Sequence, residues 1–383
     1  MHPEPETHPT FSNVELDRLQ PQRSRHHTSK RDAAIEKSHV LNILRSVSVN
    51  LRELDLGLSI ATFPTLTCTA FLRDFVATNK PVVLTMSEAR NWPAVSLWSD
   101  PDYLVQKAGN SPVTVALTPD GRADCPGWCR CNNNDNVVVP CFALPYEYET
   151  TLSTFFDLLK RANEDDHSEE NLIPYMQYQN SSLTLQLPAL LGDVPSEIPW
   201  ANEAFGSAPE AVNIWIGGKR SATSWHRDHY ENIYVVIVGS KTFRMRPPAD
   251  AYAMKLRKYP VARWQRPPDD PLPANSLPTS LFLSLLDLHT GPQVVWSSIL
   301  PSSGCMDQQE TLPGAPSALE VTVKAGEMIY LPSGWWHEVY HEDDFVVAEN
   351  YWYDMKFDVK YAYTKGIEAL AAAIGLNETL EEP

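Results

Sequence analysis

The sequence predicts a mainly β protein with flanking helices, arranged as a jelly roll. From about residue 211 the chain becomes a series of short β-branched and aromatic runs separated by Gly and Pro. The series breaks off at about residue 261 and returns late, as LEVTV, EMIYLP and FVVAENYWY. Helical spacing of apolar residues occurs mainly before and after these runs. Many short strands with one late return are typical of a jelly roll.

The first half of the chain predicts a tail and then a mixed α+β part. Residues 1–31 are rich in Pro, His, Ser and charge, so we expect a disordered tail. Apolar residues at helical spacing predict a helix from residue 32 to about 58. We assign 32–210 to the α+β part of the unit, with strands at 81–86 and 112–118 and a helix at 152–162.

The catalytic core is predicted at 211–355, and a final helix and tail at 356–383. Between the runs IYVVIV and KTFRMR, Gly239 and Ser240 predict a tight hairpin. Residues from about 261 to 317 are crowded with Pro, Ser and Asp. We interpret them as an insertion with little regular structure apart from a helix at 281–288.

The charged-residue composition narrows the classes of molecule that the protein is expected to bind. The 383 residues carry 31 basic and 48 acidic side chains, a formal charge of -17, which disfavours direct binding to nucleic acid. A basic protein segment suits that charge better. The candidate acidic loops contain Glu164, Asp165, Asp166, Glu169 and Glu170, and the pair Asp269 and Asp270.

The cellular compartment is predicted from the number and spacing of the cysteines and from the lack of recognisable targeting signals. Six irregularly spaced cysteines indicate a reducing compartment. The N-terminus lacks a signal-peptide pattern and no apolar run is long enough to span a membrane. We expect a cytoplasmic protein, with nuclear entry through the basic stretch 23–31 as the alternative. The oligomeric state, monomer or homodimer, stays open.

Three residues predict a metal site. His226 and Asp228 lie in a β-type run, where residues i and i+2 point to one face. His337, in a later run, adds a second imidazole and completes the facial triad that holds iron(II) and leaves positions open for 2-oxoglutarate and dioxygen. Lys241, later in the sequence than Asp228, is a cation that can bind the distal carboxylate of 2-oxoglutarate. We expect His229 to face away from the metal.

Three other motifs are interpreted as misleading. The string His337 to His341 matches HExxH, but a zinc protease needs it on a helix, whereas these surroundings predict a strand. His226-Arg227-Asp228 resembles a kinase loop, but no phosphate-binding loop accompanies it. The irregularly spaced Cys125, Cys129, Cys131 and Cys141 are interpreted as thiols of a polar loop rather than a zinc site.

The longer strings TSWHRDHYENIYVVIVGSKTF, GEMIYLPSGWWHEV and ENYWYDMKFDVKYAY resemble the Jumonji-C hydroxylases. They are most similar to the bifunctional peptidase and (3S)-lysyl hydroxylase subgroup, and VALTPDGRAD, IPYMQYQ and VNIWIGG extend the resemblance to roughly residues 55–370.

The resemblance implies a double-stranded β-helix with iron at its open end. It implies that Tyr175, Thr223 and Lys241 bind the distal carboxylate of 2-oxoglutarate. By the same resemblance, Asn232 and Asn350 lie beside the metal-bound end, and Tyr234 is a pocket wall.

The implied reaction is hydroxylation of a lysine side chain in a protein, with GTP-binding translation factors as the family precedent. An N-methyl-lysine demethylase and a catalytically silent cupin-like binding protein are the alternatives. The sequence supplies no identifiable nucleophile for the peptidase activity.

Overall fold

The computed structural model describes residues 30–131, 134–164, 172–179, 181–273, 276–286, 291–300 and 312–379. The chain divides into two units, Met1–Val40 and Leu41–Pro383. The predicted tail lies outside the described residues, except for its last two positions. These begin helix α2 (Lys30–Leu51), which continues as the π-helical turn η2 (Arg52–Leu56), so the predicted N-terminal helix is confirmed.

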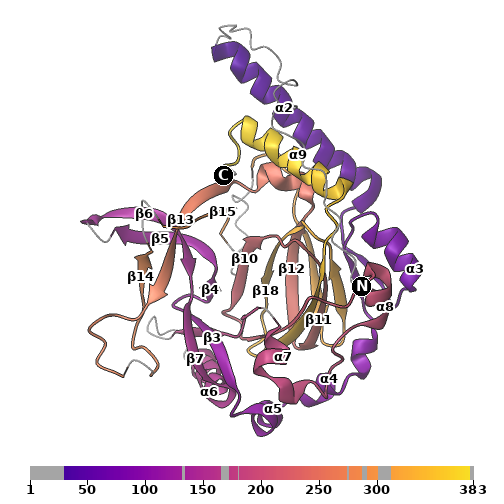
Figure 1. The fold of residues 1–383 in the computed structure, drawn as a ribbon. Helices are drawn as coiled ribbons and strands as arrows, with labels where there is room; N and C mark the ends of the chain where they lie inside the picture. The colour runs from indigo at the N-terminus through magenta and orange to yellow at the C-terminus, as the bar shows by residue number, and fades with distance from the viewer. Residues whose placement is uncertain are drawn as a thin grey trace, which may run out of the picture. The chain divides into compact units, whose positions relative to one another are not determined.

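Two sheets of the larger unit form the jelly roll, as predicted (Figure 1). In the six-stranded sheet the order is β1-β2-β17-β11-β19-β9, and in the five-stranded sheet it is β16-β12-β18-β10-β4. The bounds of the six are β1 (Ala61–Phe63), β2 (Val82–Leu84), β17 (Met328–Leu331), β11 (Tyr230–Val238), β19 (Val346–Asp354) and β9 (Ala211–Gly217). Those of the five are β16 (Leu319–Lys324), β12 (Ser240–Arg246), β18 (Trp336–Tyr340), β10 (Ala222–His226) and β4 (Arg122–Ala123).

Strand β11 explains why IYVVIV is apolar at every position. Ile233, Val235 and Ile237 belong to one buried cluster, which includes side chains of the helices that precede the β core. Tyr234 and Val236 belong to a second cluster with residues of the five-stranded sheet. Because successive side chains of a strand alternate in direction, one face of β11 covers the helices and the other fills the jelly roll.

The predicted hairpin at Gly239 and Ser240 is wrong. Strand β11 pairs with β17 and β19, whereas β12 pairs with β16 and β18, so the turn carries the chain from one sheet to the other. Gly239 has φ of +73°, a conformation that glycine adopts without a steric cost. The local signal identified the turn correctly, but it contains no information about which strands pair.

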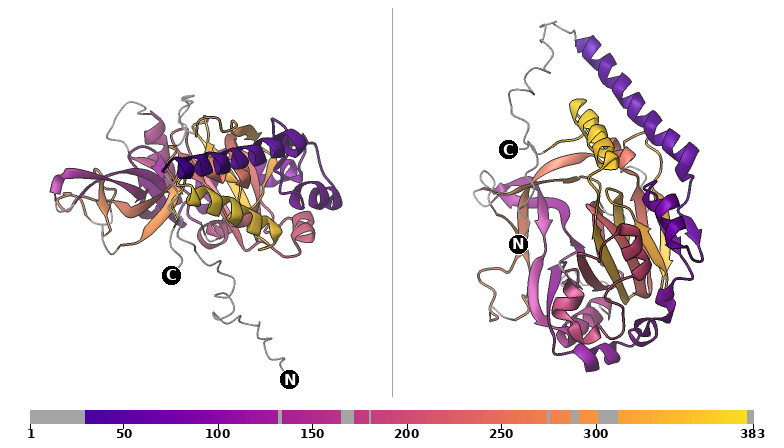
Figure 2. Two further views of the ribbon diagram at one scale, coloured as in Figure 1. Left: turned by 90° about the horizontal axis from the view of Figure 1, so that it is seen from above. Right: turned by 45° about the vertical axis from the view of Figure 1, so that its right-hand side comes forward.

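A third sheet corrects two further predictions. It has the order β14-β13-β6-β5, with β15 also paired to β13. Figures 1 and 2 show it beside the two jelly-roll sheets. The predicted helix at 281–288 is wrong, because that segment contains strand β14, and the predicted cysteine loop forms β5 and β6, where Cys125, Cys129 and Cys141 are buried. The bounds are β5 (Cys125–Cys131), β6 (Asn134–Leu144), β13 (Leu256–Gln265), β14 (Phe282–Leu285) and β15 (Gln293–Ser297).

Strand pairing explains both errors: β14 pairs with β13, β5 pairs with β6, and the pairing of β13 with β6 joins the two pairs into one sheet. Val261 lies opposite Phe142 in parallel register, so each segment completes its backbone hydrogen bonds with the other. The pairs β5–β6 and β13–β14 are antiparallel and local in the sequence, whereas the pairing of β13 with β6 joins distant segments. Asp270 is likewise not a free acidic side chain: it pairs with Arg266 at 3.0 Å and accepts a hydrogen bond from the Thr279 backbone N–H. Of the other predicted acidic loop, only Glu164 lies within the described residues.

Helices and a small sheet complete the unit before the β core. The small sheet has the order β7-β3-β8. Its strands are β3 (Pro112–Thr118), β7 (Tyr146–Thr151) and β8 (Ile173–Tyr175). The helices are α3 (Cys68–Phe71), α4 (Pro93–Leu97), α5 (Pro101–Ala108), α6 (Leu152–Glu164), α7 (Ser182–Gln186) and α8 (Pro199–Phe205), with the short helical turns η3 (Leu72–Val76), η4 (Glu88–Asn91) and η5 (Pro188–Leu190).

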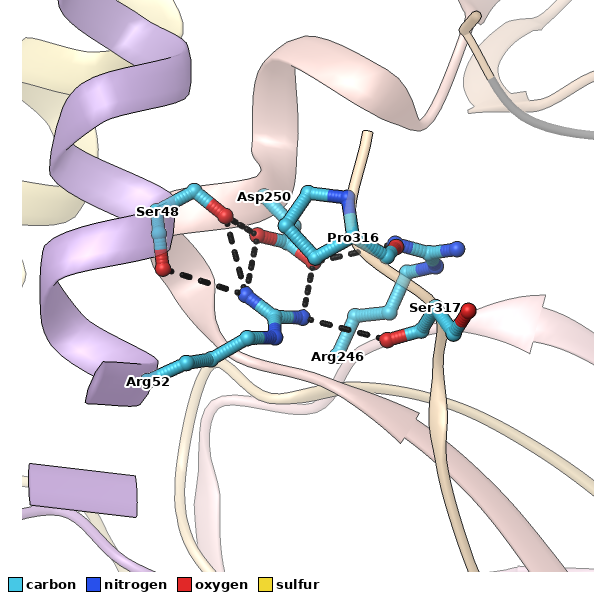
Figure 3. Close-up of polar contacts among 6 residues, drawn as sticks. All are labelled: Ser48, Arg52, Arg246, Asp250, Pro316 and Ser317. Carbon is cyan, nitrogen blue, oxygen red and sulfur yellow. Dashed lines mark hydrogen bonds and ion pairs between the residues drawn. The ribbon is translucent and has the colours of Figure 1, made fainter. Parts of the chain in front are cut away.

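A buried charge network holds the N-terminal turn η2 to the core (Figure 3). Asp250, in the turn η6 (Pro248–Ala253), is fully buried between Arg52 at 2.6 Å and Arg246 at 3.0 Å. Ser48 Oγ donates to the same carboxylate, and Arg246 also donates to the Pro316 carbonyl oxygen. One carboxylate thus satisfies donors from two distant parts of the chain.

The last helix, α9 (Val359–Ala373), confirms the predicted final helix, although it begins at Val359 rather than at about residue 356. Asp358 caps it by accepting a hydrogen bond from the Lys360 N–H. No helix in the described parts of the chain combines the length and the apolar character that crossing a membrane requires.

Candidate metal centre

Two adjacent strands bring the predicted ligands together. His226 ends β10 and lies directly opposite His337 of β18 in antiparallel register. Their ring centroids are 4.1 Å apart. Asp228 lies two residues beyond the end of β10, so the predicted same-strand geometry is wrong, although the residues do meet. Asp228 Oδ2 is 3.9 Å from His226 Nε2 and 3.8 Å from His337 Nε2.

These three residues have the donor set of a facial triad. Within the described residues, one ligand atom from each lies within 4.8 Å of the others, close enough for a single metal ion. His226 and Asp228 are partly exposed, whereas His337 is buried. Two imidazoles and one carboxylate are the ligands of non-haem iron(II) oxygenases, in which further coordination positions stay open.

Backbone carbonyl groups fix the orientation of both imidazoles. The Ser224 carbonyl oxygen lies 2.8 Å from His226 Nδ1, and the Trp335 carbonyl oxygen lies 3.0 Å from His337 Nδ1. A carbonyl oxygen only accepts, so each Nδ1 must carry the proton and each Nε2 is left as a lone-pair donor. Burial is the main cause that lowers the pKa of His337 to about 4, which keeps its ring neutral.

The loop that carries Asp228 is anchored by the connection between β17 and β18. The Gly334 N–H donates to the Asp228 carbonyl oxygen at 2.9 Å. Next to it, Ser333 donates to the Glu231 carboxylate from both its N–H and its hydroxyl. Gly334 has φ of +76°, which favours glycine at this position of the sequence SGWWHEV.

A buried lysine lies deeper in the jelly roll. Lys241, only 1% exposed, donates from Nζ to the Tyr175 hydroxyl at 3.0 Å. The faces of the Tyr175, Trp215 and Tyr234 rings surround it at 5.4, 5.9 and 5.6 Å. Burial lowers the pKa of Lys241 to about 7. No carboxylate of the described chain forms an ion pair with it, an arrangement that suits an anionic ligand.

The remaining predicted residues line one cavity with Lys241 and the triad. Tyr175 accepts a hydrogen bond from Lys241 and shares another with Thr223, and all three line the cavity. Asn350 accepts a hydrogen bond from the Trp215 indole at 2.8 Å and donates to Asn232 at 3.4 Å. The structure adds residues that the sequence interpretation did not assign: Gln179, Trp215, Phe243, Leu331, Val339 and Trp352. Alternation along β9 and β11 was the signal that could have identified Trp215.

The two neighbouring histidines lie outside the triad. His229 is in the connection between β10 and β11 and contributes no ligand atom to the group. His341 follows β18, so the HExxH string is extended, as predicted, and its two histidines do not share one helical face. His341 is buried, with its ring 6.4 Å from that of Tyr175.

Comparison with known proteins gives consistent matches over most of the chain. The family model of the cupin-like domain matches residues 68–359. The chain is 36% identical to "Lysine-specific demethylase JMJ32" of Arabidopsis thaliana, over 84% of this chain and 89% of that protein. It is 35% identical to "Bifunctional peptidase and (3S)-lysyl hydroxylase JMJD7" of Homo sapiens, over 80% and 87%. "JmjC domain-containing protein E" of Dictyostelium discoideum is 33% identical, over 78% and 84%.

Proposed function

The chain belongs to the cupin-like family of Jumonji-C oxygenases, and from this premise we propose that it uses iron(II) and 2-oxoglutarate to hydroxylate a lysine side chain of a protein. One observation carries the proposal. A three-donor metal group and a buried cation without a carboxylate partner line the same cavity. A metal ion would bind the three donors, and a dicarboxylate would pair with the buried cation.

The residues of the cavity fit the two cofactors. His226, Asp228 and His337 would hold iron(II), because two neutral imidazoles and a carboxylate are suitable ligands and leave positions open. Lys241 would pair with the distal carboxylate of 2-oxoglutarate, supported by the Tyr175 hydroxyl and by Thr223, with which Tyr175 also shares a hydrogen bond.

When bound, iron(II) and 2-oxoglutarate supply dioxygen activation and the electrons for C–H hydroxylation. The protein contributes geometry and exclusion of water. The carbonyl groups of Ser224 and Trp335 hold the two imidazole rings in a fixed orientation. Hydrogen bonds from Trp215 to Asn350 and from Asn350 to Asn232 fix the polar wall beside them. Buried Phe243 and Leu331 keep the cavity wall apolar.

Demethylation of an N-methyl-lysine is the second candidate, because one relative is named a lysine-specific demethylase and another a lysyl hydroxylase. Hydroxylation of an N-methyl carbon would use the same metal and cosubstrate positions. A silent binding protein is disfavoured, since the metal donors and Lys241 are all present.

The experiment incubates the full chain with iron(II), 2-oxoglutarate and paired peptides that differ only in lysine or N-methyl-lysine. Mass spectrometry separates a gain of one oxygen from the loss of a methyl group. The proposal expects oxygen gain on the lysine peptide, with succinate formed alongside it, and neither product with Asp228→Ala. Methyl loss as the only change would favour the demethylase, and absence of succinate under all conditions would remove the oxygenase proposal.

A further inference from the structure

We infer that a second cavity beside His226 receives the side chain of the substrate lysine, and that Trp296 and Glu378 select it. The inference rests on the proposed function, because it specifies which side chain approaches the same metal centre. His226 lines both this cavity and the one that contains Lys241. The metal ligand therefore forms the boundary between a cosubstrate side and an open side from which a second molecule can approach.

The second cavity has room for a long side chain. Its volume is about 360 Å³. Leu256, Val295, Trp296 and Trp336 give it apolar walls, and Glu378 lies at its exposed rim. Lysine has an apolar stem and a charged end, so it can lay the stem against such walls while the ammonium group reaches a carboxylate in solvent.

Trp296 is held firmly against the metal ligand. Strand β15 places its ring parallel to that of His226, at an interplanar angle of 1° and a centroid distance of 6.0 Å. The indole N–H donates to Ser224 Oγ at 3.0 Å, and the Phe142 ring packs on the indole with centroids 4.7 Å apart. Ser224 also offers its carbonyl oxygen to His226, so one residue joins the cavity wall to the metal ligand.

Two carboxylates, Glu368 and Glu378, and two cations, Arg227 and Lys365, line the cavity. Arg227 and Glu368 form an ion pair with each other, and Lys365, which is half exposed, lies 3.8 Å from Glu368. Glu378 accepts a hydrogen bond from the Lys258 backbone N–H and forms no ion pair within the described chain. A lysine ammonium would supply the cation that this carboxylate lacks.

The test uses n-pentylammonium, which reproduces the end of a lysine side chain, with pentanoate as the matched anion of similar shape. The full chain is labelled with fluorotryptophan and loaded with 2-oxoglutarate and zinc(II), a diamagnetic substitute for iron(II). Fluorine NMR then follows its eleven tryptophans separately. The Trp296 resonance is assigned by its absence from the Trp296→Phe variant.

We expect n-pentylammonium to shift the Trp296 resonance saturably and pentanoate to leave it in place. Trp128 is the internal control, because it is 71% exposed on β5 and lies outside the cavity. Glu378→Gln should weaken n-pentylammonium binding roughly three- to tenfold, as expected for a carboxylate at an exposed rim. Glu53→Gln, on the exposed side of η2, should leave the binding unchanged.

Equal shifts with pentanoate, an unchanged Trp296 resonance, or full binding by Glu378→Gln would overturn the inference. The experiment needs no turnover, so it can be separated from the proposed function. Binding at Trp296 in a protein that forms no succinate would remove the oxygenase proposal and keep the cation-binding cavity. Succinate formation without a Trp296 response would keep the oxygenase proposal and remove the cavity.

Discussion

His226 and His337 lie opposite each other on adjacent antiparallel strands, with their rings 4.1 Å apart. The register of β10 and β18, rather than the spacing within one strand, therefore decides that the two imidazoles meet. Asp228 then joins them from the loop after β10, whose backbone is held by Gly334. The metal centre is thus a product of strand pairing between segments that are far apart in the sequence.

The first prediction concerns the carboxylate of this centre. Asp228→Ala should bind metal at least about tenfold more weakly, because it removes one of three ligands and the negative charge of the donor set, and even changes to groups that only orient the ligands cost about 10- to 100-fold in metal affinity. Metal content measured after dialysis and succinate formation should fall together. His229→Ala is the matched control and should retain stoichiometric metal. Loss of metal from His341→Ala instead would favour a different ligand set that includes the second histidine of HExxH.

The second prediction concerns pH and Lys241, whose pKa burial lowers to about 7. Only the protonated amine pairs with a carboxylate, so 2-oxoglutarate binding should be independent of this group below pH 7. Above it, binding takes up one proton, and the dissociation constant should rise about tenfold per pH unit. Calorimetry in buffers of different ionisation enthalpy measures that proton uptake. Lys241→Met should bind weakly at every pH and lack this slope, and an unchanged slope would exclude Lys241.

The sequence predicted the jelly roll, because strand alternation is a local signal, and it named His226, Asp228 and His337, although the strand alternation assumed for Asp228 does not hold, because Asp228 lies beyond the end of β10. It did not predict that β13 pairs with β6, nor that the chain passes from one sheet to the other at Gly239. Both features depend on contacts between distant segments. The position of Trp296 beside His226 was missed for the same reason. Its strand lies in a segment whose composition indicated irregular structure.

The third prediction concerns the buried network in Figure 3. Asp250→Ala should lower the free energy of unfolding by about 3 to 5 kcal/mol, because it leaves Arg52 and Arg246 buried without their carboxylate. Urea denaturation measures the change. The exposed pair of Arg73 and Asp74 gives the control, since Asp74→Ala should leave the denaturation midpoint unchanged. If the triple variant Arg52→Met, Arg246→Met, Asp250→Ala were no more stable than Asp250→Ala alone, the unpaired charges would not be the cause.

The fourth prediction concerns how a basic substrate reaches the cavity. The net charge of -17 should attract a basic protein segment from a distance, so the association rate should fall as salt rises from low to physiological strength. Exposed charges are screened over about 8 to 10 Å at those concentrations, whereas contacts inside the cavity are screened less. Stopped-flow measurements with the protein substrate can separate the two, because steering changes the association rate and cavity contacts change the dissociation rate. Asp269→Lys is a better charge reversal than one at Asp270, whose carboxylate is already used by Arg266 and Thr279. An association rate independent of both salt and this reversal would contradict the steering and leave the metal centre unaffected.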